Sequence, residues 1–166
     1  MSQNRHFISP GQAQPPLLAG IDLGGTDVKA GVVDDLGRPL SWLTIPTEPQ
    51  NGPETAAQRM GKLVLETIHK AGLEPSAAVR AGLGSPGILD VSAGKLVKLV
   101  NFKGWDGFPL RDRLGAHCGL PVTFANDANA AADGEFWGGA GRDFHSMVLF
   151  TLGTGIGCGI IVGDMT

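Results

Sequence analysis

The residues best suited to chemistry near the start of the chain are Asp22 and the Gly24-Gly25-Thr26 turn that follows it. Glycines let the backbone come close to a ligand, and successive N–H groups in such a turn can form a nest for an anion. Thr26 adds a hydroxyl donor, and the Asp22 carboxylate suits Mg²⁺, which takes oxygen ligands. The stretch predicts a site for a phosphate and its metal. Taken alone, an ordinary glycine turn beside a solvent-facing Asp explains it at least as well.

A second glycine-threonine turn, Gly153-Thr154-Gly155-Ile156-Gly157, follows the apolar run SMVLFTL near the other end of the sequence. It repeats the first layout, which is an apolar strand, a Gly-Thr turn and another apolar strand. Each layout places a backbone anion nest and a Thr hydroxyl at the tip of a predicted hairpin. Two such tips that face each other across a cleft would hold a polyphosphate from both sides.

Asn126-Asp127 lies at a predicted strand-to-helix junction, where Asp127 has two interpretations. As structure, it is a helix N-cap that accepts backbone N–H bonds, and the spacing alone favours this use. As chemistry, its carboxylate accepts a proton from a substrate hydroxyl while Asn126 holds a neighbouring hydroxyl. The loop at residues 82–87, GLGSPG, is similarly open. It is a ligand loop at a strand end or, about equally well, a structural turn.

The elements that must position these residues alternate between strands and helices. Apolar runs predict strands, the first two joined as a hairpin, at residues 17–23, 28–33, 39–46, 78–84, 121–125, 146–152 and 158–162. Helices are predicted at residues 53–72, 110–118 and 128–137, and the first has Pro near its start and Gly at its end. Trp105 and Phe108 are expected to pack in the core or at a hinge. The pattern indicates the α/β class.

Composition narrows the function classes. The 166 residues are long enough for one domain with a core, and 13 Lys and Arg against 16 Asp and Glu, without a basic cluster, argue against a nucleic-acid partner. No apolar run is long enough to cross a bilayer, so no membrane partner is expected. Cys118 and Cys158 lack CxxC spacing and suit a reduced, cytoplasmic protein. Residues 1–16 are polar and Pro-rich and are expected to form a disordered tail.

Two common nucleotide motifs do not fit these turns. Gly20 and Gly25 have the spacing of a Walker A loop, but Thr26 stands where that loop needs Lys. The dinucleotide pattern GxGxxG fails at the second turn, because Cys158 occupies its last position. Both turns also precede strand-like runs, whereas those motifs open helices. P-loop and Rossmann interpretations are therefore disfavoured.

Four motifs together resemble the ROK family of repressors and sugar kinases, most closely its bacterial glucokinases. They are DLGGT, GLGSPG, NDANAA and GTGIG, at residues 22–26, 82–87, 126–131 and 153–157. The resemblance covers the sequence from Leu17 to its end, although many actin-like ATPases share the first motif. It implies an actin-like, ribonuclease-H-like ATPase fold, with a mixed sheet flanked by helices and a cleft between two lobes. The N-terminal lobe would span residues 17–120, and residues 121–166 would begin a truncated second lobe.

The resemblance also implies a role for each motif residue. Asp22 would lie near the metal-bound phosphates, and Asp127 would be the catalytic base. Two turns would bind the phosphates of ATP: Gly24, Gly25 and Thr26, and then Gly153, Thr154 and Gly155. The sugar would be bound by Asn126, Pro86 and Gly87, with Asn101 also near it.

The implied reaction moves the terminal phosphoryl group of ATP, with Mg²⁺, to the 6-hydroxyl of a hexose such as glucose. The family continues with a Glu and a His that grip the sugar, a His/Cys₃ zinc site and an adenosine-binding segment, and none of these is in this sequence. We therefore expect a weakly active or inactive chain, whose unpaired edge strand favours association, such as a homodimer. A sugar-sensing regulator of the same family and a non-catalytic fragment are the alternatives. The choice of hexose, and of ATP or polyphosphate as donor, stays open.

Overall fold

The first hairpin forms the centre of the main sheet. The structure, a computed structural model, describes residues 6–99, 102–153 and 155–163. The sheet has the strand order β3-β2-β1-β4-β7. Its strands are β1 (Leu17–Leu23), β2 (Asp27–Val33), β3 (Pro39–Pro46), β4 (Ala78–Ser85) and β7 (Val122–Asn126). The β1–β2 and β2–β3 pairs are antiparallel, whereas β1–β4 and β4–β7 are parallel, so the sheet is mixed as predicted.

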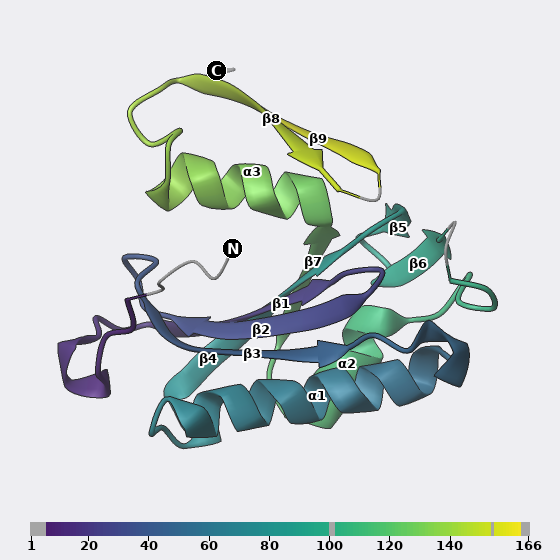
Figure 1. The fold of residues 1–166 in the computed structure, drawn as a ribbon, viewed down its shortest axis with the longest axis horizontal. Helices are drawn as coiled ribbons and strands as arrows, with labels where there is room; N and C mark the ends of the chain where they lie inside the picture. The colour runs from purple at the N-terminus through teal and green to yellow at the C-terminus, as the bar shows by residue number, and fades with distance from the viewer. Residues whose placement is uncertain (1–5, 100–101, 154, 164–166) are drawn as a thin grey trace.

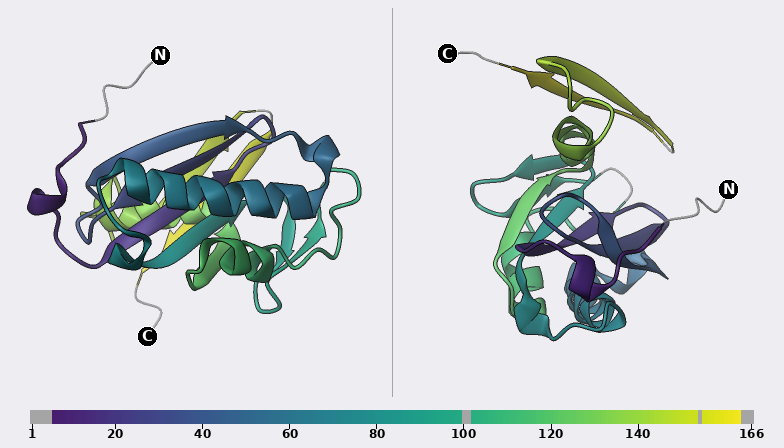
Figure 2. Two further views of the ribbon diagram at one scale, coloured as in Figure 1. Left: turned by 90° about the horizontal axis from the view of Figure 1, so that it is seen from below. Right: turned by 90° about the vertical axis from the view of Figure 1, so that its left-hand side faces the viewer.

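The remaining elements lie on both sides of this sheet (Figure 1). Helices α1 (Pro53–Lys70) and α2 (Leu110–Cys118) cover one face. Helix α3 (Asp127–Gly138) and the hairpin of β8 (Ser146–Leu152) and β9 (Ile156–Val162) lie on the opposite side, as Figure 1 and the right-hand view of Figure 2 show. A small hairpin, β5 (Ile88–Asp90) with β6 (Lys95–Lys98), follows β4. Short 3₁₀ helices span Pro10–Gln12, Pro49–Asn51 and Pro75–Ala77.

The core lies between the sheet and α1 and α2. Alternate residues of β1 and β2 point into it, as the period of two in a strand requires. The buried side chains of these strands and of α1 include Ala19, Ile21, Leu23, Val28, Ala30, Val32, Met60, Leu63, Val64 and Ile68. Trp105 is fully buried and donates a hydrogen bond from Nε1 to the Pro49 carbonyl at 3.1 Å. Phe108 is partly buried against the same core.

The opposite face of the sheet carries few large side chains. Gly31, Gly20 and Gly82 are neighbours in register across β2, β1 and β4. Trp42 of β3 lies beside Gly31, so that a Cβ built on this glycine would be 2.8 Å from the indole ring. Because these glycines have no side chains, the sheet surface is open on the side where α3 and the second hairpin lie.

The N-terminal segment is more ordered than predicted. From His6 on, where its description begins, the expected tail packs on the sheet, and the Ile8 N–H donates to the Pro39 carbonyl at 3.0 Å. The Gln14 N–H donates to Asp34 Oδ2 at 3.0 Å, and the guanidinium of Arg38 binds the same oxygen. Burial raises the pKa of Asp34, but these hydrogen bonds outweigh it and hold the pKa well below its usual range. The polar composition of the segment does not reveal this anchor, because its partner, Asp34, lies outside the segment and is brought near by the fold.

Strand β7 pairs with β4 over five residues and so completes the first sheet. The sequence predicts the second lobe from residue 121, which would separate this strand from that sheet. The observed pairing favours a boundary after Asn126, although the division into lobes itself stays a prediction. Helix α3 then leads from the sheet to the β8–β9 hairpin, which forms a separate two-stranded sheet.

Candidate functional site

The first glycine turn is held from one side and open on the other. The Gly24 N–H donates to the Asp27 carbonyl at 3.0 Å, and the Thr47 hydroxyl donates to the Gly24 carbonyl at 2.7 Å. A Cβ at residue 24 would lie 2.7 Å from the Asp27 carbonyl oxygen, so only glycine fits this tight turn. Gly25 and Thr26 are exposed at the tip. The tip therefore offers backbone donors and a hydroxyl to a ligand.

The second glycine turn joins β8 to β9. The Gly153 N–H donates to the Gly155 carbonyl at 2.9 Å, and both glycines are exposed. Thr154 lies outside the described residues. Gly157, the last glycine of this motif, does something different, because it lies in β9 and packs close to Ala128 of α3. The motif thus combines a turn with a packing surface.

One cavity of about 1350 Å³ brings the two turns together. The sheet face that carries the row of glycines forms one wall of this cavity. Helix α3 and the tip of the second hairpin form the other wall. The predicted site residues along its wall are Asp22, Gly24, Gly25, Thr26, Pro86, Gly87, Asn126, Asp127, Gly153 and Gly155. Asn101 falls outside the described residues, as does Thr154. The two turns are about 130 residues apart in the sequence, and their juxtaposition is the geometry that a polyphosphate site needs, while the individual roles stay predictions.

The cap of α3 is Asn126, not Asp127. Asn126 Oδ1 accepts hydrogen bonds from the N–H groups of Ala128 at 3.0 Å and Asn129 at 3.4 Å. Its Nδ2 donates to the Gly87 carbonyl at 3.3 Å, which ties the GLGSPG loop to the helix. Asp127 is the first residue of the helix, and its Oδ1 accepts from the adjacent Ala128 N–H at 2.9 Å. The structural interpretation of Asp127 as the cap is therefore wrong, and its carboxylate borders the cavity.

Sequence reasoning missed Lys29. This residue lies directly opposite Asp22 in the β1–β2 register, and its Nζ is 3.4 Å from Asp22 Oδ2. Both side chains line the cavity. A hairpin with a four-residue loop at residues 24–27 pairs positions 22 and 29, so a turn placed at residues 24–26 from the glycine motif would have put residue 28 opposite Asp22 instead. Lys29 was overlooked because it lies outside the glycine motif.

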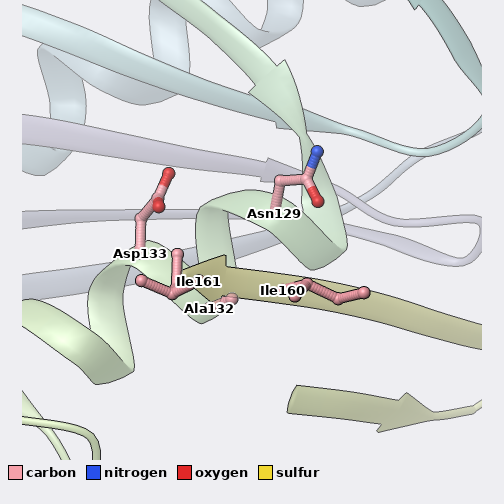
Figure 3. Close-up of a pocket in the computed structure, with 5 residues that line it drawn as sticks. All are labelled: Asn129, Ala132, Asp133, Ile160 and Ile161. Carbon is pink, nitrogen blue, oxygen red and sulfur yellow. The ribbon is translucent and has the colours of Figure 1, made fainter. Parts of the chain in front are cut away.

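A smaller cavity of about 250 Å³ lies between α3 and β9 (Figure 3). Asn129, Ala132 and Asp133 come from the helix, and Ile160 and Ile161 come from the strand. Figure 3 shows the side chains of Asn129 and Asp133 on the same side of the helix, one turn apart. Asp133 also lines the larger cavity, so the two spaces are neighbours.

Magnesium fits the larger cavity better than a metal that needs many protein ligands. Within the described ranges, no group of three or more His, Cys, Asp or Glu side chains is placed to hold a metal ion. Mg²⁺ is commonly bound by one or two carboxylates together with water and substrate phosphates. Asp22 beside the first turn meets that requirement. Cys158 is exposed on β9, and Cys118 is buried in α2, where burial raises the pKa of its thiol.

The topology of the sheet defines the fold class of the protein. Three antiparallel strands continued by two parallel ones, with helices on both sides, are arranged as in the actin-like ATPase fold. Two glycine hairpin tips at one cavity are consistent with that class. The chain belongs to the ROK family, whose model matches residues 18–166. In the described part of the chain, no helix combines the length and the apolar character needed to span a membrane.

Several relatives have known names or structures. A glucokinase of Thermotoga maritima is 40% identical over 144 residues, which are 87% of this chain and 44% of that enzyme. A ROK family glucokinase from Streptomyces griseus, crystallised with glucose and AMPPNP, is 37% identical with a TM-score of 0.80 over 89% of this chain and 45% of that one. An inorganic polyphosphate/ATP-glucomannokinase from Arthrobacter sp. strain KM is 32% identical with a TM-score of 0.73, covering 90% of this chain and 59% of that one. The chain thus spans less than half the length of the Thermotoga maritima and Streptomyces griseus glucokinases.

Proposed function

We propose that this chain provides the phosphate-binding turns and the catalytic base of a glucokinase-like sugar kinase. The supporting observation is the single cavity that both glycine turns share with Asp127. The similar Streptomyces griseus enzyme was crystallised with glucose and AMPPNP, which supports a hexose and ATP as the ligands of this cavity. The Arthrobacter relative uses polyphosphate or ATP, so the donor is defined here as a chain of phosphates.

The proposed mechanism assigns one role to each group along the cavity. The N–H groups of Gly25 and Gly155 and the Thr26 hydroxyl donate to phosphate oxygens, and this neutralises charge that develops during transfer. Gly24 and Gly153 keep the two turns in shape, because their N–H groups donate within the turns. Asp127 orients the sugar hydroxyl and accepts its proton as the new P–O bond forms. Proton transfer to a positioned carboxylate contributes about 10²–10⁴-fold to a rate. Magnesium held near Asp22 would supply further charge neutralisation at the phosphates.

Calorimetry on the 166-residue chain tests the binding half of this proposal. We expect heat of binding with magnesium AMPPNP and, separately, with glucose. The same titrations are made on the longest reading frame that contains this chain, and if neither protein binds either ligand, the proposal fails. If the longest reading frame that contains this chain binds glucose but never transfers phosphate, it would fit the sugar-sensing regulators of the same family instead.

Asp127→Asn tests the catalytic half. We expect this variant to bind magnesium AMPPNP within about twofold of the wild type, because the carboxylate faces the sugar and not the phosphates. Formation of glucose 6-phosphate should fall by about 10²–10⁴-fold. The assay uses this chain and the longest reading frame that contains it. Asp143→Asn, in an exposed loop after α3, is the matched control. Equal rates for Asp127→Asn and the wild type would remove Asp127 as the base.

A further inference from the structure

The Lys29–Asp22 ion pair is poorly explained as a stabilising contact. The side chains keep 42% and 48% of their exposure, and the N···O distance is a long 3.4 Å. Exposed pairs of this kind contribute little to stability, typically below about 1 kcal/mol. The neighbours of Lys29 along β2, Val28 and Ala30, point into the core, so the lysine necessarily projects from the opposite, cavity face.

Lys29 also stands out in the charge of the cavity. The described residues along its wall include four carboxylates, at Asp22, Asp27, Asp127 and Asp133, and one cationic side chain, at Lys29. A polyphosphate that enters an excess of carboxylates is repelled unless cations offset the charge. The Lys29 ammonium is therefore the protein's own cation for this purpose, and in the absence of ligand Asp22 holds it beside the first glycine turn.

We propose that Lys29 is a phosphate-positioning residue that exchanges partners when the ligand binds. Its ammonium group leaves the Asp22 carboxylate and donates to a phosphate oxygen, which frees Asp22 to face the magnesium ion. This inference rests on the proposed function, since it assigns a further ligand of the same phosphate site. An ammonium is suited to the exchange, because its three donors sit on a flexible stem and need no fixed planar geometry.

The first test is calorimetry with magnesium pyrophosphate on the 166-residue chain. A hydrogen bond to a charged group is worth enough that Lys29→Met should raise the Kd by about 10- to 100-fold. Lys29→Arg, which keeps the charge, should recover much of the affinity. The matched control is Lys62→Met on α1, which removes an ammonium from another exposed ion pair, with Glu66 at 3.5 Å. We expect that variant to bind like the wild type.

The partner exchange has its own readout in Asp22→Asn. This variant leaves the ammonium without its carboxylate, so it should bind magnesium-free pyrophosphate more tightly than the wild type, while magnesium should strengthen its binding less. Acylation of Lys29 by an amine reagent, measured by mass spectrometry, should be suppressed by magnesium pyrophosphate in the wild type. Lys62 should react equally with and without the ligand.

The outcomes of these tests distinguish a failure of the Lys29 inference from a failure of the proposed kinase function. Wild-type affinity in Lys29→Met, or unchanged metal-free binding in Asp22→Asn, overturns the inference and leaves the kinase proposal standing. Unprotected Lys29 in saturated protein has the same consequence. If the wild type binds neither pyrophosphate nor AMPPNP, both proposals fail together.

Discussion

Gly159→Ala tests whether close packing between α3 and β9 shapes the cavity. Gly159 is buried in β9, and a Cβ there would lie 2.5 Å from the Ala132 Cβ and 2.6 Å from the Ala128 carbonyl oxygen. Ordinary carbon contacts are about 3.5–4.0 Å, so the helix and strand must separate by roughly 1 Å. Overpacking of this kind costs about 1–3 kcal/mol. A cost of about 2 kcal/mol makes local opening of the hairpin about 30-fold more frequent.

Hydrogen exchange followed by mass spectrometry measures this opening directly. Peptides that cover β8 and β9 should exchange about 30-fold faster in Gly159→Ala, at the size of effect given above, whereas peptides from β1 should be unchanged. Affinity for magnesium pyrophosphate should fall as well, because the displaced hairpin carries the second of the two glycine turns proposed to bind phosphate. Adding Ala132→Gly removes one of the two clashes and should restore part of the protection.

The control substitution is Gly134→Ala, in the same helix, where the new Cβ would have no described atom within 4 Å apart from the backbone of its own helix and its chain neighbours. Alanine is favoured over glycine within a helix by about 1 kcal/mol, so this variant should not loosen the hairpin. Unchanged exchange of β8 and β9 in Gly159→Ala would refute the packing argument. So would equal loosening by Gly134→Ala, since that change introduces no clash.

Two further predictions concern carboxylates with lowered pKa values. Asp34→Asn should lower the free energy of unfolding by about 2 kcal/mol, because the partly exposed Arg38 loses the buried half of its ion pair. Urea titration should also show that the wild type loses the Asp34 contribution to its free energy of unfolding as pH falls below about 4, whereas this variant does not. The control variant, exposed Asp35→Asn, should behave like the wild type. Hydrogen bonds, chiefly from Arg113, lower the pKa of Glu54 to about 2. Its stabilising effect should be complete above about pH 4.5 and lost toward pH 2, so urea midpoints at pH 3 and 6 should differ less in Glu54→Gln than in the wild type.

The elements that were predicted well are those whose signals are local. Helix α2 spans the predicted residues 110–118, and α1 ends two residues before the predicted position 72. Both helices have their boundary residues, Pro or Gly, next to an amphipathic segment, so no distant contact is needed to define them. The first hairpin was equally clear, because two apolar runs flank one glycine turn.

The features that were missed depend on partners far away in the sequence. The N-terminal segment is anchored by Asp34, 20 residues after its partner Gln14. The pairing of β7 with β4 joins strands about 40 residues apart. Gly157 and Gly159 cannot be told from the turn glycines in the sequence, but they lie in β9 and allow α3 to pack close to that strand. Composition and periodicity describe a single segment and carry no information about such distant contacts.

Two adjacent side chains at the start of α3, those of Asn126 and Asp127, have different structural roles. An N-cap at the start of α3 needs one side-chain oxygen, and either Asn126 or Asp127 could have supplied it. Asn126 supplies it with Oδ1 and uses its amide nitrogen to hold Gly87, so both ends of this side chain are engaged. Asp127 is therefore not needed as the cap, and its carboxylate lies at the helix N-terminus, where the dipole favours a negative charge. The neutral amide of Asn126 therefore caps the helix, and the ionisable side chain of Asp127 lies at the cavity wall, where the proposed function uses it as the base.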